Sequence, residues 1–368
     1  MSKLPPTRRA DRDRPLPRLN EPADPPTETA DGETMTAVVQ EAYGPEPEDV
    51  LRLAEITKPT AGANEVLVRV HASSVDRGTW HVMSGLPYAI RLAGFGFRTP
   101  KAINPGRSLA GTVEAVGADV SGFKPGEEVF GISEGGSFAD FAAVRASKLA
   151  SKPASLSFEQ SAAVPISGLT ALQAVRDHAR IEEGQSVLIV GASGGVGTLA
   201  VQIAKAFGAE VTGVCSTAKV DAVRGLGADH VIDYTREDFA DRGRHYDAIL
   251  DIGGNRRLSH LRRALTARGR LVIVGGETDG RWLGGSDRQI RATLLSHFVP
   301  QKLGTFISSE NADDLVVLTE LVASGKLTPA IDRTYPLGET AAAIRHMLDG
   351  HARGKIVITG GTATAAFA

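Results

Sequence analysis

The chain has 368 residues, a formal net charge of −2 and 42% hydrophobic residues. Because one hydrophobic core seldom supports so long a chain, two domains are predicted, and the near-neutral charge excludes a general attraction to nucleic acids. Cys215 is the only cysteine, which excludes an intrachain disulfide and a cysteine-rich metal centre and favours a reducing, cytoplasmic compartment.

The N-terminal segment, residues 1–34, is rich in Pro, Arg, Asp and Glu and contains no aromatic residue. Such a segment offers too little apolar surface to offset the entropy of ordering, so a disordered tail is expected. Along the whole sequence, no apolar run approaches the roughly 20 residues that cross a bilayer. A membrane is therefore not an expected partner.

Short strands interrupted by Gly and Pro turns are predicted from residue 35 to about residue 153, for example at 36–40 and 66–70. From about residue 157, strands alternate with helices, which indicates a doubly wound parallel sheet. The strands of this sheet are predicted at 186–190, 210–215, 230–234, 248–252, 270–274 and 293–298. The predicted fold class is therefore α/β, with a β-rich domain and a parallel-sheet domain.

The C-terminal part is predicted to return to the β-rich domain. An amphipathic helix at 313–323 is followed by a proline turn and a terminal strand at 355–359. The expected domains are a β-rich catalytic domain at 35–156 and 300–368 and a cofactor domain at 157–299, inserted between these two parts.

The segment SVLIVGASGGVGTLAVQIAKAFG combines an apolar strand, a glycine-rich turn and an amphipathic helix. Ala192, Gly194 and Gly197 have the spacing of the dinucleotide fingerprint, in which glycines let the backbone approach a pyrophosphate. The amides at the helix N-terminus favour that anion. A dinucleotide site is therefore predicted, with a turn formed by Ala192, Ser193, Gly194, Gly195, Val196 and Gly197.

The residues after the second parallel strand decide which dinucleotide fits. An acidic residue there would bind the ribose 2′-hydroxyl of NAD and repel the 2′-phosphate of NADP, but this strand ends in Cys215, Ser216 and Thr217. Lys219 follows, near a helix start that favours anions. NADPH is therefore the predicted cofactor. The alternative is a solvated Lys219 and a helix cap at Ser216 or Thr217.

Four stretches together resemble the medium-chain dehydrogenase/reductase superfamily: GRSLAGTVEAVGADVSGFKPGEEVFG, SAAVPISGLTALQAV, VLIVGASGGVG and GADHVIDY. The resemblance covers essentially residues 35–360 and points to the zinc-free quinone oxidoreductase-like branch, particularly to alcohol dehydrogenase-like members with the pattern seen here as SSVDRGTWHVMSGLPY. It implies a GroES-like β-rich domain, a Rossmann domain with a doubly wound parallel sheet, and an active-site cleft between them. It also implies a homodimer formed through the edge of the Rossmann sheet.

The resemblance extends to individual cofactor positions. It implies that Tyr234 joins Ser216 and Lys219 at the 2′-phosphate, and that Thr170 meets the nicotinamide side of the cofactor. The ends of the fourth and fifth parallel strands are expected to pass beside the nicotinamide ribose. The residues at these ends are Gly253, Val274, Gly275 and Gly276. The alternative is that they only end the strands.

The positions that hold a catalytic metal in zinc-dependent relatives correspond, by this resemblance, to Asp76, Arg107 and Ile166. An arginine stays protonated and an alkyl side chain cannot coordinate, so one carboxylate remains where a catalytic zinc needs three protein ligands. The nine histidines show no ligand spacing. No metal is therefore expected.

Asp76 and Arg77 stand where zinc-free relatives commonly have an Asn-Pro pair, and Ser108 stands where they commonly have Asp. An ion pair between Asp76 and Arg107 is one expectation, and it would either line the cleft or only tie two loops together. Hydride transfer also requires a donor for negative charge on the acceptor. The candidate catalytic residues are Arg107, Asp76 and Tyr88, with His81 and Thr79 as further donors.

These features predict direct hydride transfer from NADPH to a quinone, an enone or another small carbonyl compound. In such a reaction the cofactor supplies the chemistry and the protein supplies orientation and electrostatics. The alternative is a catalytically weak or inactive NADPH-binding protein with a sensor or structural role, since a fold alone does not establish a function.

Overall fold

A computed structural model of the chain describes residues 32–241, 243–275, 280, 282 and 284–360. Most of the predicted tail lies outside the described residues, and Thr34 already belongs to the first strand, β1 (Thr34–Val39). From Thr34 onward the chain forms one compact unit. Among the described residues, no helix is both long and apolar enough to cross a membrane.

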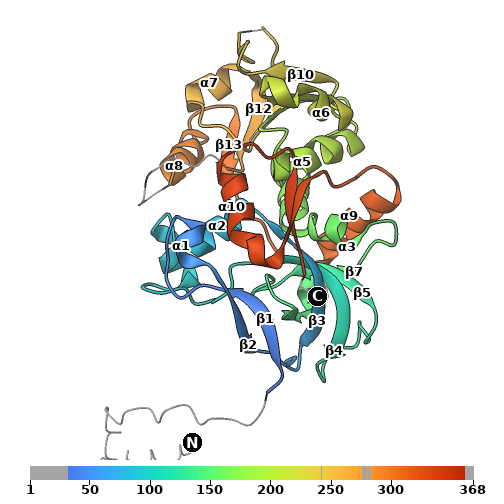
Figure 1. Cartoon of the computed structure of the whole chain (residues 1–368). Coiled ribbons are helices and arrows are strands. Elements are labelled where there is room, and N and C mark those ends of the chain that lie inside the picture. The colour runs from blue at the N-terminus through green and yellow to red at the C-terminus, as the bar shows by residue number, and fades with distance from the viewer. Residues whose placement is uncertain (1–31, 242, 276–279, 281, 283, 361–368) are drawn as a thin grey trace, which may run out of the picture. The chain divides into compact units, whose positions relative to one another are not determined.

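One of the two large sheets of this unit has seven strands (Figure 1). Its strands are β3 (Glu65–Val75), β4 (Ser108–Val116), β5 (Glu128–Ile132), β6 (Phe141–Arg145), β7 (Leu149–Ser151), β14 (Ile331–Pro336) and β15 (Lys355–Thr359). They follow the order β14-β15-β3-β4-β5-β7, with β6 also paired to β3, while β1 pairs with β2 (Arg52–Thr57) in a separate ribbon. The predicted GroES-like β-rich domain is confirmed.

The other large sheet has six parallel strands in the order β10-β9-β8-β11-β12-β13 (Figure 1). They are β8 (Ser186–Val190), β9 (Glu210–Cys215), β10 (His230–Asp233), β11 (Tyr246–Asp251), β12 (Leu265–Ile273) and β13 (Lys302–Thr305). The strand order reverses between β8 and β11. At such a reversal the connections leave on opposite faces, and the crevice between them binds nucleotides in Rossmann folds.

Both faces of the parallel sheet are covered, because alternate residues of a strand join different hydrophobic clusters. Val187 and Ile189 of β8 cluster with Leu199 of α5 (Gly195–Ala206). Leu188, between them in sequence, clusters instead with Leu261 of α7 (Leu258–Arg263). Successive side chains of a strand point to opposite faces, so the predicted doubly wound arrangement is confirmed.

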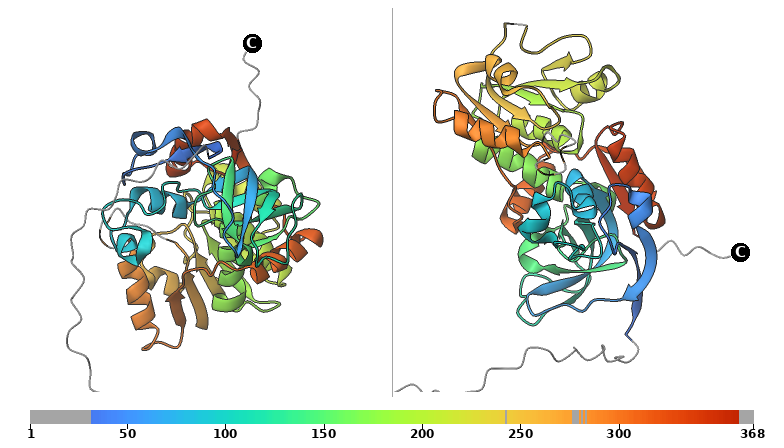
Figure 2. Two further views of the ribbon diagram at one scale, coloured as in Figure 1. Left: turned by 90° about the horizontal axis from the view of Figure 1, so that it is seen from below. Right: turned by 90° about the vertical axis from the view of Figure 1, so that its left-hand side faces the viewer.

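The remaining helices connect the strands and cover the sheets. They are α1 (Pro47–Val50), α2 (Arg77–Ser84), α3 (Phe158–Ala162), α4 (Pro165–Gln173), α6 (Val220–Gly225), α8 (Ser286–Leu295), α9 (Ala312–Ala323) and α10 (Thr340–Leu348). Short 3-10 or π-helical segments are η1 (Arg91–Phe95), η2 (Ala146–Lys148), η3 (Ala174–Ala179), η4 (Thr217–Lys219) and η5 (Leu337–Glu339). α10 contacts both α1 and β15, so the C-terminal part packs against the N-terminal part (Figure 2).

The sixth parallel strand was predicted at the wrong place. Residues 293–298 do not form it, because α8 occupies residues up to Leu295 and the strand is β13, after residue 299. The apolar run in this segment has a helical period: Arg288 and Ala292 are buried and Leu295 packs on the same cluster as Ala292. The domain boundaries at 156, 157, 299 and 300 remain predictions.

The C-terminal strand β15 has the predicted bounds and lies between β14 and β3. It pairs antiparallel with the last residues of β3, with Ile356 opposite Val75. Just before it, Gly354 forms an isolated parallel bridge with Gly194 of the glycine-rich turn. This bridge places the first residue of β15, Lys355, at the junction of the two sheets.

Candidate functional site

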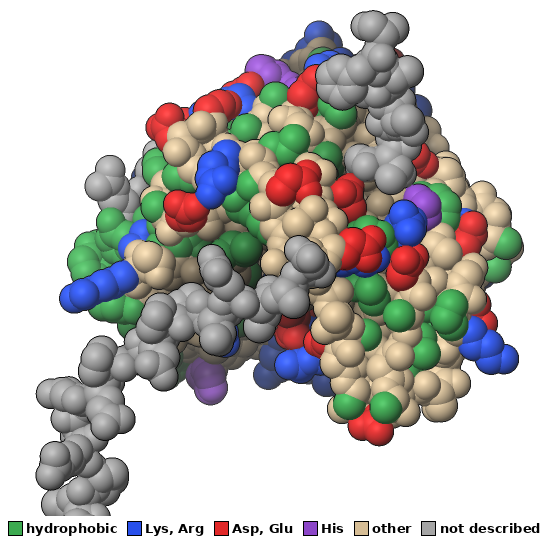
Figure 3. Space-filling view, turned by 60° about the horizontal axis from the view of Figure 1, so that its bottom comes forward, with side chains coloured by type: hydrophobic (Ala, Val, Ile, Leu, Met, Phe, Trp, Pro, Cys, Tyr) green, Lys and Arg blue, Asp and Glu red, His purple; other side chains and the backbone are tan. Residues whose placement is uncertain are grey.

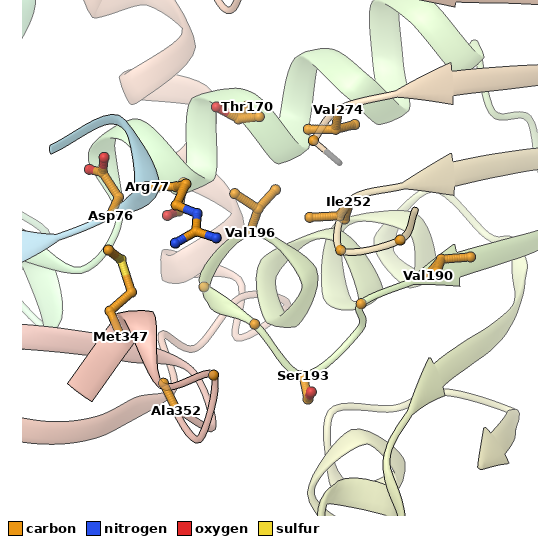
Figure 4. Close-up of a pocket in the computed structure, with 18 of the residues that line it drawn as sticks. Asp76, Arg77, Thr170, Val190, Ser193, Val196, Ile252, Val274, Met347 and Ala352 are labelled. Carbon is orange, nitrogen blue, oxygen red and sulfur yellow. The ribbon is translucent and has the colours of Figure 1, made fainter. Parts of the chain in front are cut away.

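A cavity of about 830 Å³ opens at the carboxyl ends of β8, β9, β11 and β12, where the strand order reverses. Its other wall comes from the start of α2, from α4 and from the segment between α10 and β15 (Figure 4). Residues 306–308, after β13, complete the lining. The volume lies within the roughly 300–1,000 Å³ typical of ligand pockets.

The turn after β8 is shaped by contacts that only glycine allows. Gly191 has a φ of +85°, and a Cβ there would lie 2.7 Å from the backbone nitrogen of Gly253. At Gly197, a Cβ would lie 2.1 Å from the carbonyl oxygen of Gly191. The backbone of α5 therefore packs directly on the turn, and the N-terminus of α5 faces the cavity.

The six predicted turn residues have two different roles. Ser193, Gly194, Gly195 and Val196 line the cavity (Figure 4), and Gly194 is the N-cap of α5. Ala192 and Gly197 are not among the cavity-lining residues, because Ala192 is buried in the hydrophobic core and Gly197 contacts the turn backbone. They support the turn from beneath.

The residues predicted for the 2′-phosphate, Ser216, Lys219 and Tyr234, all line one end of the cavity. Lys219 is not a solvated side chain: its Nζ donates hydrogen bonds to the carbonyl oxygens of Gly350 at 3.1 Å and Ala352 at 2.8 Å. Burial lowers the pKa of the Lys219 amine. Lys219 thus connects the end of the parallel sheet to the segment before β15.

A carboxylate does lie near this end of the cavity, but on the neighbouring strand. Asp233, the last residue of β10, pairs in register with Cys215. Its side chain accepts hydrogen bonds from the hydroxyls of Thr217 at 2.6 Å and Thr235 at 2.7 Å. The hydrogen bond from Thr217 is the main cause that lowers the pKa of Asp233. The carboxylate is therefore engaged in fixing the turn after β10.

The predicted nicotinamide-side residues lie together at the other end of the cavity. Thr170, Gly253, Val274 and Gly275 all line it (Figure 4), while Gly276 lies outside the described residues. The hydroxyl of Thr170 donates a hydrogen bond to the carbonyl of Ile166 at 2.8 Å. Here the turns after β11 and β12 approach through backbone atoms, which leaves space for a ligand beside them.

Asp76 is the N-cap residue of α2 and belongs to the lining of the cavity on the side of the seven-stranded sheet (Figure 4). Its Oδ1 accepts a hydrogen bond from the backbone N–H of Thr79 at 3.0 Å, as an N-cap residue does. Its Oδ2 is buried and has no hydrogen-bond partner among the described residues. His81, one turn further along α2, also lines the cavity.

Two cationic side chains enter the cavity from the same side, and the sequence interpretation assigned neither of them to the site. The Arg77 guanidinium extends from α2 towards Val196 at the N-terminus of α5 (Figure 4). Lys355 lines the cavity but is only 2% exposed, and its Nζ donates a hydrogen bond to the carbonyl of Val75 at 2.9 Å. The Lys355 side chain passes over Gly195, where a Cβ would lie 2.9 Å from its Cδ.

Burial disfavours the charged form of the Lys355 amine. Burial lowers the pKa of its amine, and the nearby Asp76 carboxylate opposes this effect. Buried ammonium groups are rare in proteins unless they are paired or bind an anion. Lys355 lies beside Gly195 at the N-terminus of α5, and the Asp76 carboxylate is the anionic side chain that acts on it.

Two of the three candidate catalytic residues lie outside this cavity. Neither Arg107 nor Tyr88 is among the described residues that line it. The expected ion pair between Asp76 and Arg107 is wrong, because Arg107 pairs with Glu310 at 2.8 Å. Tyr88 makes an edge-to-face contact with Trp282, with ring centroids 5.2 Å apart. The catalytic assignment of Asp76, Arg107 and Tyr88 remains a prediction.

The donor set expected for a catalytic zinc is not assembled. Among the described residues, no group of three or more His, Cys, Asp or Glu side chains could hold a metal ion. At the positions that correspond to zinc ligands in metal-dependent relatives, Arg107 pairs with Glu310 and Ile166 has an alkyl side chain. These residues do not fit a zinc ion.

Comparisons with known proteins agree with this geometry. The sequence model of the family described as "Alcohol dehydrogenase GroES-like domain" matches residues 62–154, and that described as "Zinc-binding dehydrogenase" matches residues 226–358. The chain is 31% identical over 339 residues to "Quinone-oxidoreductase QR1, chloroplastic" of Triphysaria versicolor, covering 89% of this chain and 99% of that protein. The chain belongs to the medium-chain dehydrogenase/reductase superfamily, in its quinone oxidoreductase-like branch.

Two further proteins support the same family assignment. "NAD(P)H oxidoreductase RTN4IP1, mitochondrial" of Homo sapiens is 34% identical over 328 residues, covering 80% of this chain and 81% of that protein. The solved structure of the quinone oxidoreductase from Coxiella burnetii superposes with a TM-score of 0.77 at 28% identity, covering 89% of this chain and 99% of that chain. The resemblance predicted from sequence motifs is confirmed.

Proposed function

We propose that the protein is a zinc-independent, NADPH-dependent oxidoreductase that transfers a hydride to a quinone, an enone or another small carbonyl compound. One observation carries this proposal: the glycine-rich turn and the N-terminus of α5 face two cationic side chains, Arg77 and Lys355, across the cavity. Backbone amides on one side and cations on the other suit a pyrophosphate.

The rest of the cavity divides into two ends that suit the two halves of the cofactor. Ser216, Lys219 and Tyr234 would hold the adenine-side ribose and its 2′-phosphate. Backbone groups at Gly253 and Gly275, with the side chains of Thr170 and Val274, would hold the nicotinamide half. When bound, the cofactor would supply the hydride, and these residues would hold its nicotinamide half in the cavity that Asp76 and His81 also line.

The preference for NADPH is proposed from the charges near Ser216. Lys219 supplies a cation there, and β9 ends without a carboxylate. The nearest candidate for repulsion, Asp233, directs its oxygens to Thr217 and Thr235. A charge-assisted contact to a 2′-phosphate contributes about 1.5–3 kcal/mol, which is enough to separate the two cofactors by at least tenfold.

The acceptor is proposed to be a quinone or a related small conjugated carbonyl compound, as the names of the relatives suggest. Apolar side chains of Ile166, Phe306 and Met347 line the cavity and suit the flat, apolar body of such a molecule. From α2, the ring of His81 and the guanidinium of Arg77 line the cavity and are the proposed hydrogen-bond donors for the acceptor oxygen.

Purified protein tests this function directly. We expect NADPH oxidation with quinones, enones or aldehydes, a much weaker reaction with NADH, and full activity after treatment with EDTA. Elemental analysis should find no stoichiometric zinc. One zinc per chain, or equal affinities for NADPH and NADH, would contradict the corresponding part of the proposal, and tight NADPH binding without turnover on any acceptor would favour a sensor.

The proposed partners follow from the surface and from the open sheet edge. On the face drawn in Figure 3, acidic and basic side chains lie intermixed, which does not suit a nucleic-acid partner. β13 is the last strand of the parallel sheet, and its free edge could pair with the same strand of a second copy, giving the expected homodimer. A cytoplasmic location stays a prediction from the single cysteine.

A further inference from the structure

Arg288 is a buried arginine beside the cavity, in the first turn of α8. Its guanidinium lies 2.6 Å from Oδ2 of Asp251, the fully buried last residue of β11. The same guanidinium donates hydrogen bonds to the carbonyl oxygens of Arg256 at 3.0 Å and Gly275 at 3.2 Å. One side chain therefore binds three acceptors that come from two different strand ends.

These acceptors belong to the turns that form the nicotinamide end of the cavity. Residues 252–256 after β11 and residues 274 and 275 after β12 all line it. The two turns touch through their backbones, because a Cβ at Gly275 would lie 2.3 Å from the carbonyl oxygen of Ile252. The N–H groups of Val274 and Gly275 donate hydrogen bonds to the carbonyl oxygen of Asp251 at 2.9 and 3.2 Å, which joins the two turns where they begin. The Arg288 guanidinium adds a second link, from Gly275 to Arg256 at the far end of the first turn.

We propose that Arg288 is a positioning residue for the nicotinamide half of the cofactor. It does not line the cavity itself. By holding the carbonyls of Arg256 and Gly275, with Asp251 as its counter-ion, it fixes the spacing of two turns that meet the nicotinamide ribose. The inference rests on the proposed function only in requiring that a nicotinamide dinucleotide binds in this cavity.

The planar shape of the side chain is part of the argument. A guanidinium presents five N–H donors in a fixed fork, whereas an ammonium is a compact charge on a flexible stem. Lysine at this position would keep the charge opposite Asp251, but its ammonium could not present the same pair of N–H donors to the two carbonyls. Arg288→Lys therefore separates the geometric role from simple neutralisation of a buried acid.

The ion pair between Asp251 and Arg288 is also expected to depend on pH, in a range where the protein can be assayed. Burial raises the pKa of the Asp251 carboxyl to about 6, and the Arg288 guanidinium, with the N–H of Gly254, opposes that rise. Among the described residues, Arg288 is the charged group that acts on Asp251. Below pH 6 the carboxyl is protonated and the guanidinium loses its counter-ion, so its hold on the turns should weaken.

The decisive experiment measures two ligands on the same variants. NADPH occupies the whole cavity, whereas 2′,5′-ADP carries only the adenine half. Arg288→Met and Arg288→Lys should weaken NADPH binding by about 10- to 100-fold and lower kcat, as a small misplacement of a binding group does. The affinity for 2′,5′-ADP should change less than about twofold, since the adenine end is built by other residues.

Two controls make the result specific. Arg291→Met removes an arginine from the same helix that pairs with Asp287 on the surface, and it should change neither ligand's affinity. The affinity of the parent protein for NADPH relative to 2′,5′-ADP, which carries the same titrating 2′-phosphate, should fall below about pH 6, and Asp251→Asn, which cannot titrate, should abolish that relative fall. Circular dichroism establishes that each variant is folded, and Arg288→Lys provides the answer if Arg288→Met does not fold.

Three results would overturn the inference: unchanged NADPH affinity in folded Arg288→Lys, equal losses for NADPH and 2′,5′-ADP, or a persistent pH effect in Asp251→Asn. Failure of the proposed function looks different. In that case the parent protein itself would bind neither NADPH nor 2′,5′-ADP, whatever residue stands at position 288.

Discussion

The most informative single change is Lys355→Met, because it separates cofactor binding from folding. Lys355 is 2% exposed, and its pKa is lowered by burial, so its charge is unfavourable in the folded protein without a ligand. Methionine has a similar length and needs no solvation. The variant loses one hydrogen bond to Val75 and a buried charge, but it also leaves the Asp76 carboxylate without its nearby cation, so stability is compared in the Asp76→Asn background, where the melting temperature should stay the same or rise.

NADPH affinity should change in the opposite direction. If Lys355 binds the pyrophosphate, its loss removes one charge-assisted contact of about 1.5–3 kcal/mol, which corresponds to a rise in Kd of about 10- to 150-fold. Isothermal titration of NADPH and a thermal melt give the two quantities. Lys148→Met is the matched control, because Lys148 is a partly buried lysine that pairs with Glu134 and Glu310 and does not line the cavity.

The dependence on pH provides a second readout. A lysine with a lowered pKa in the folded state binds fewer protons there than in the unfolded state, so its contribution to stability rises with pH. NADPH affinity should fall over the same range, as the amine loses its charge. Both trends should vanish in Lys355→Met. A variant that binds NADPH like the parent would refute the assignment of Lys355 to the pyrophosphate, and a clear loss of stability in the Asp76→Asn background would show that the Lys355 charge serves the fold.

The remaining predictions concern residues around the cavity. Lys219→Ala should weaken NADPH binding by about 10- to 150-fold and NADH binding far less; equal losses would mean that Lys219 serves only its contacts with Gly350 and Ala352. Thr217→Val should lower the melting temperature at pH 7, because it removes a hydrogen bond to the Asp233 carboxylate. The difference from the parent should shrink as the pH falls through the lowered pKa of Asp233, because the parent then loses its own carboxylate; a difference that does not change with pH would show that this hydrogen bond is not the cause. Arg107→Met should cost about 1 kcal/mol of stability through Glu310, with kcat unchanged, and a tenfold loss of kcat would restore a catalytic role for Arg107.

The strand, turn and helix of the proposed nucleotide site could be predicted from the sequence because their determinants are local. The strand β8, the turn and the helix α5 are consecutive in the chain, and the glycines are required by contacts within that same segment. The bounds of β8, β9 and β15 agree with the predicted ranges. A pattern that contains both partners of each essential contact can be interpreted without knowing the rest of the fold.

The misplaced sixth strand shows where such local interpretation is ambiguous. The run from residue 293 to 298 is short and half apolar, with Leu294, Leu295 and Phe298, and such a short run is compatible with either a strand or a helical turn. The inward-facing residues Arg288, Ala292 and Leu295 have the spacing of a helix, but one of them is an arginine. The arginine at one of these inward positions makes the helical period hard to recognise in the sequence. Arg288 is buried beside its counter-ion, Asp251.

The partners of the charged residues could not be predicted for the same reason. Arg107 and Glu310 are 203 positions apart in the sequence, and their contact depends on where the segment after β13 returns to the seven-stranded sheet. The expected partner, Asp76, instead caps α2 and keeps one oxygen buried without a hydrogen bond. The residue type of Arg107 indicated that it would pair with a carboxylate, and only the tertiary arrangement shows that this carboxylate belongs to Glu310.

The position of Lys355 in the sequence could be interpreted only once the order of the strands was known. In the stretch RGKIVIT, a lysine opens an apolar terminal strand, which usually means a solvated strand end. Here β15 lies between β14 and β3, and Gly354 is bridged to Gly194, so the strand begins inside the cavity rather than at the surface. The glycine-rich turn proposed to bind the cofactor is thus one continuous segment. The cations proposed to bind on the other side, Arg77 and Lys355, come from distant segments that meet because β15 pairs with β3. A cofactor bound between them would hold the two sheets together, which explains why a buried, unfavourable charge is tolerated at that position.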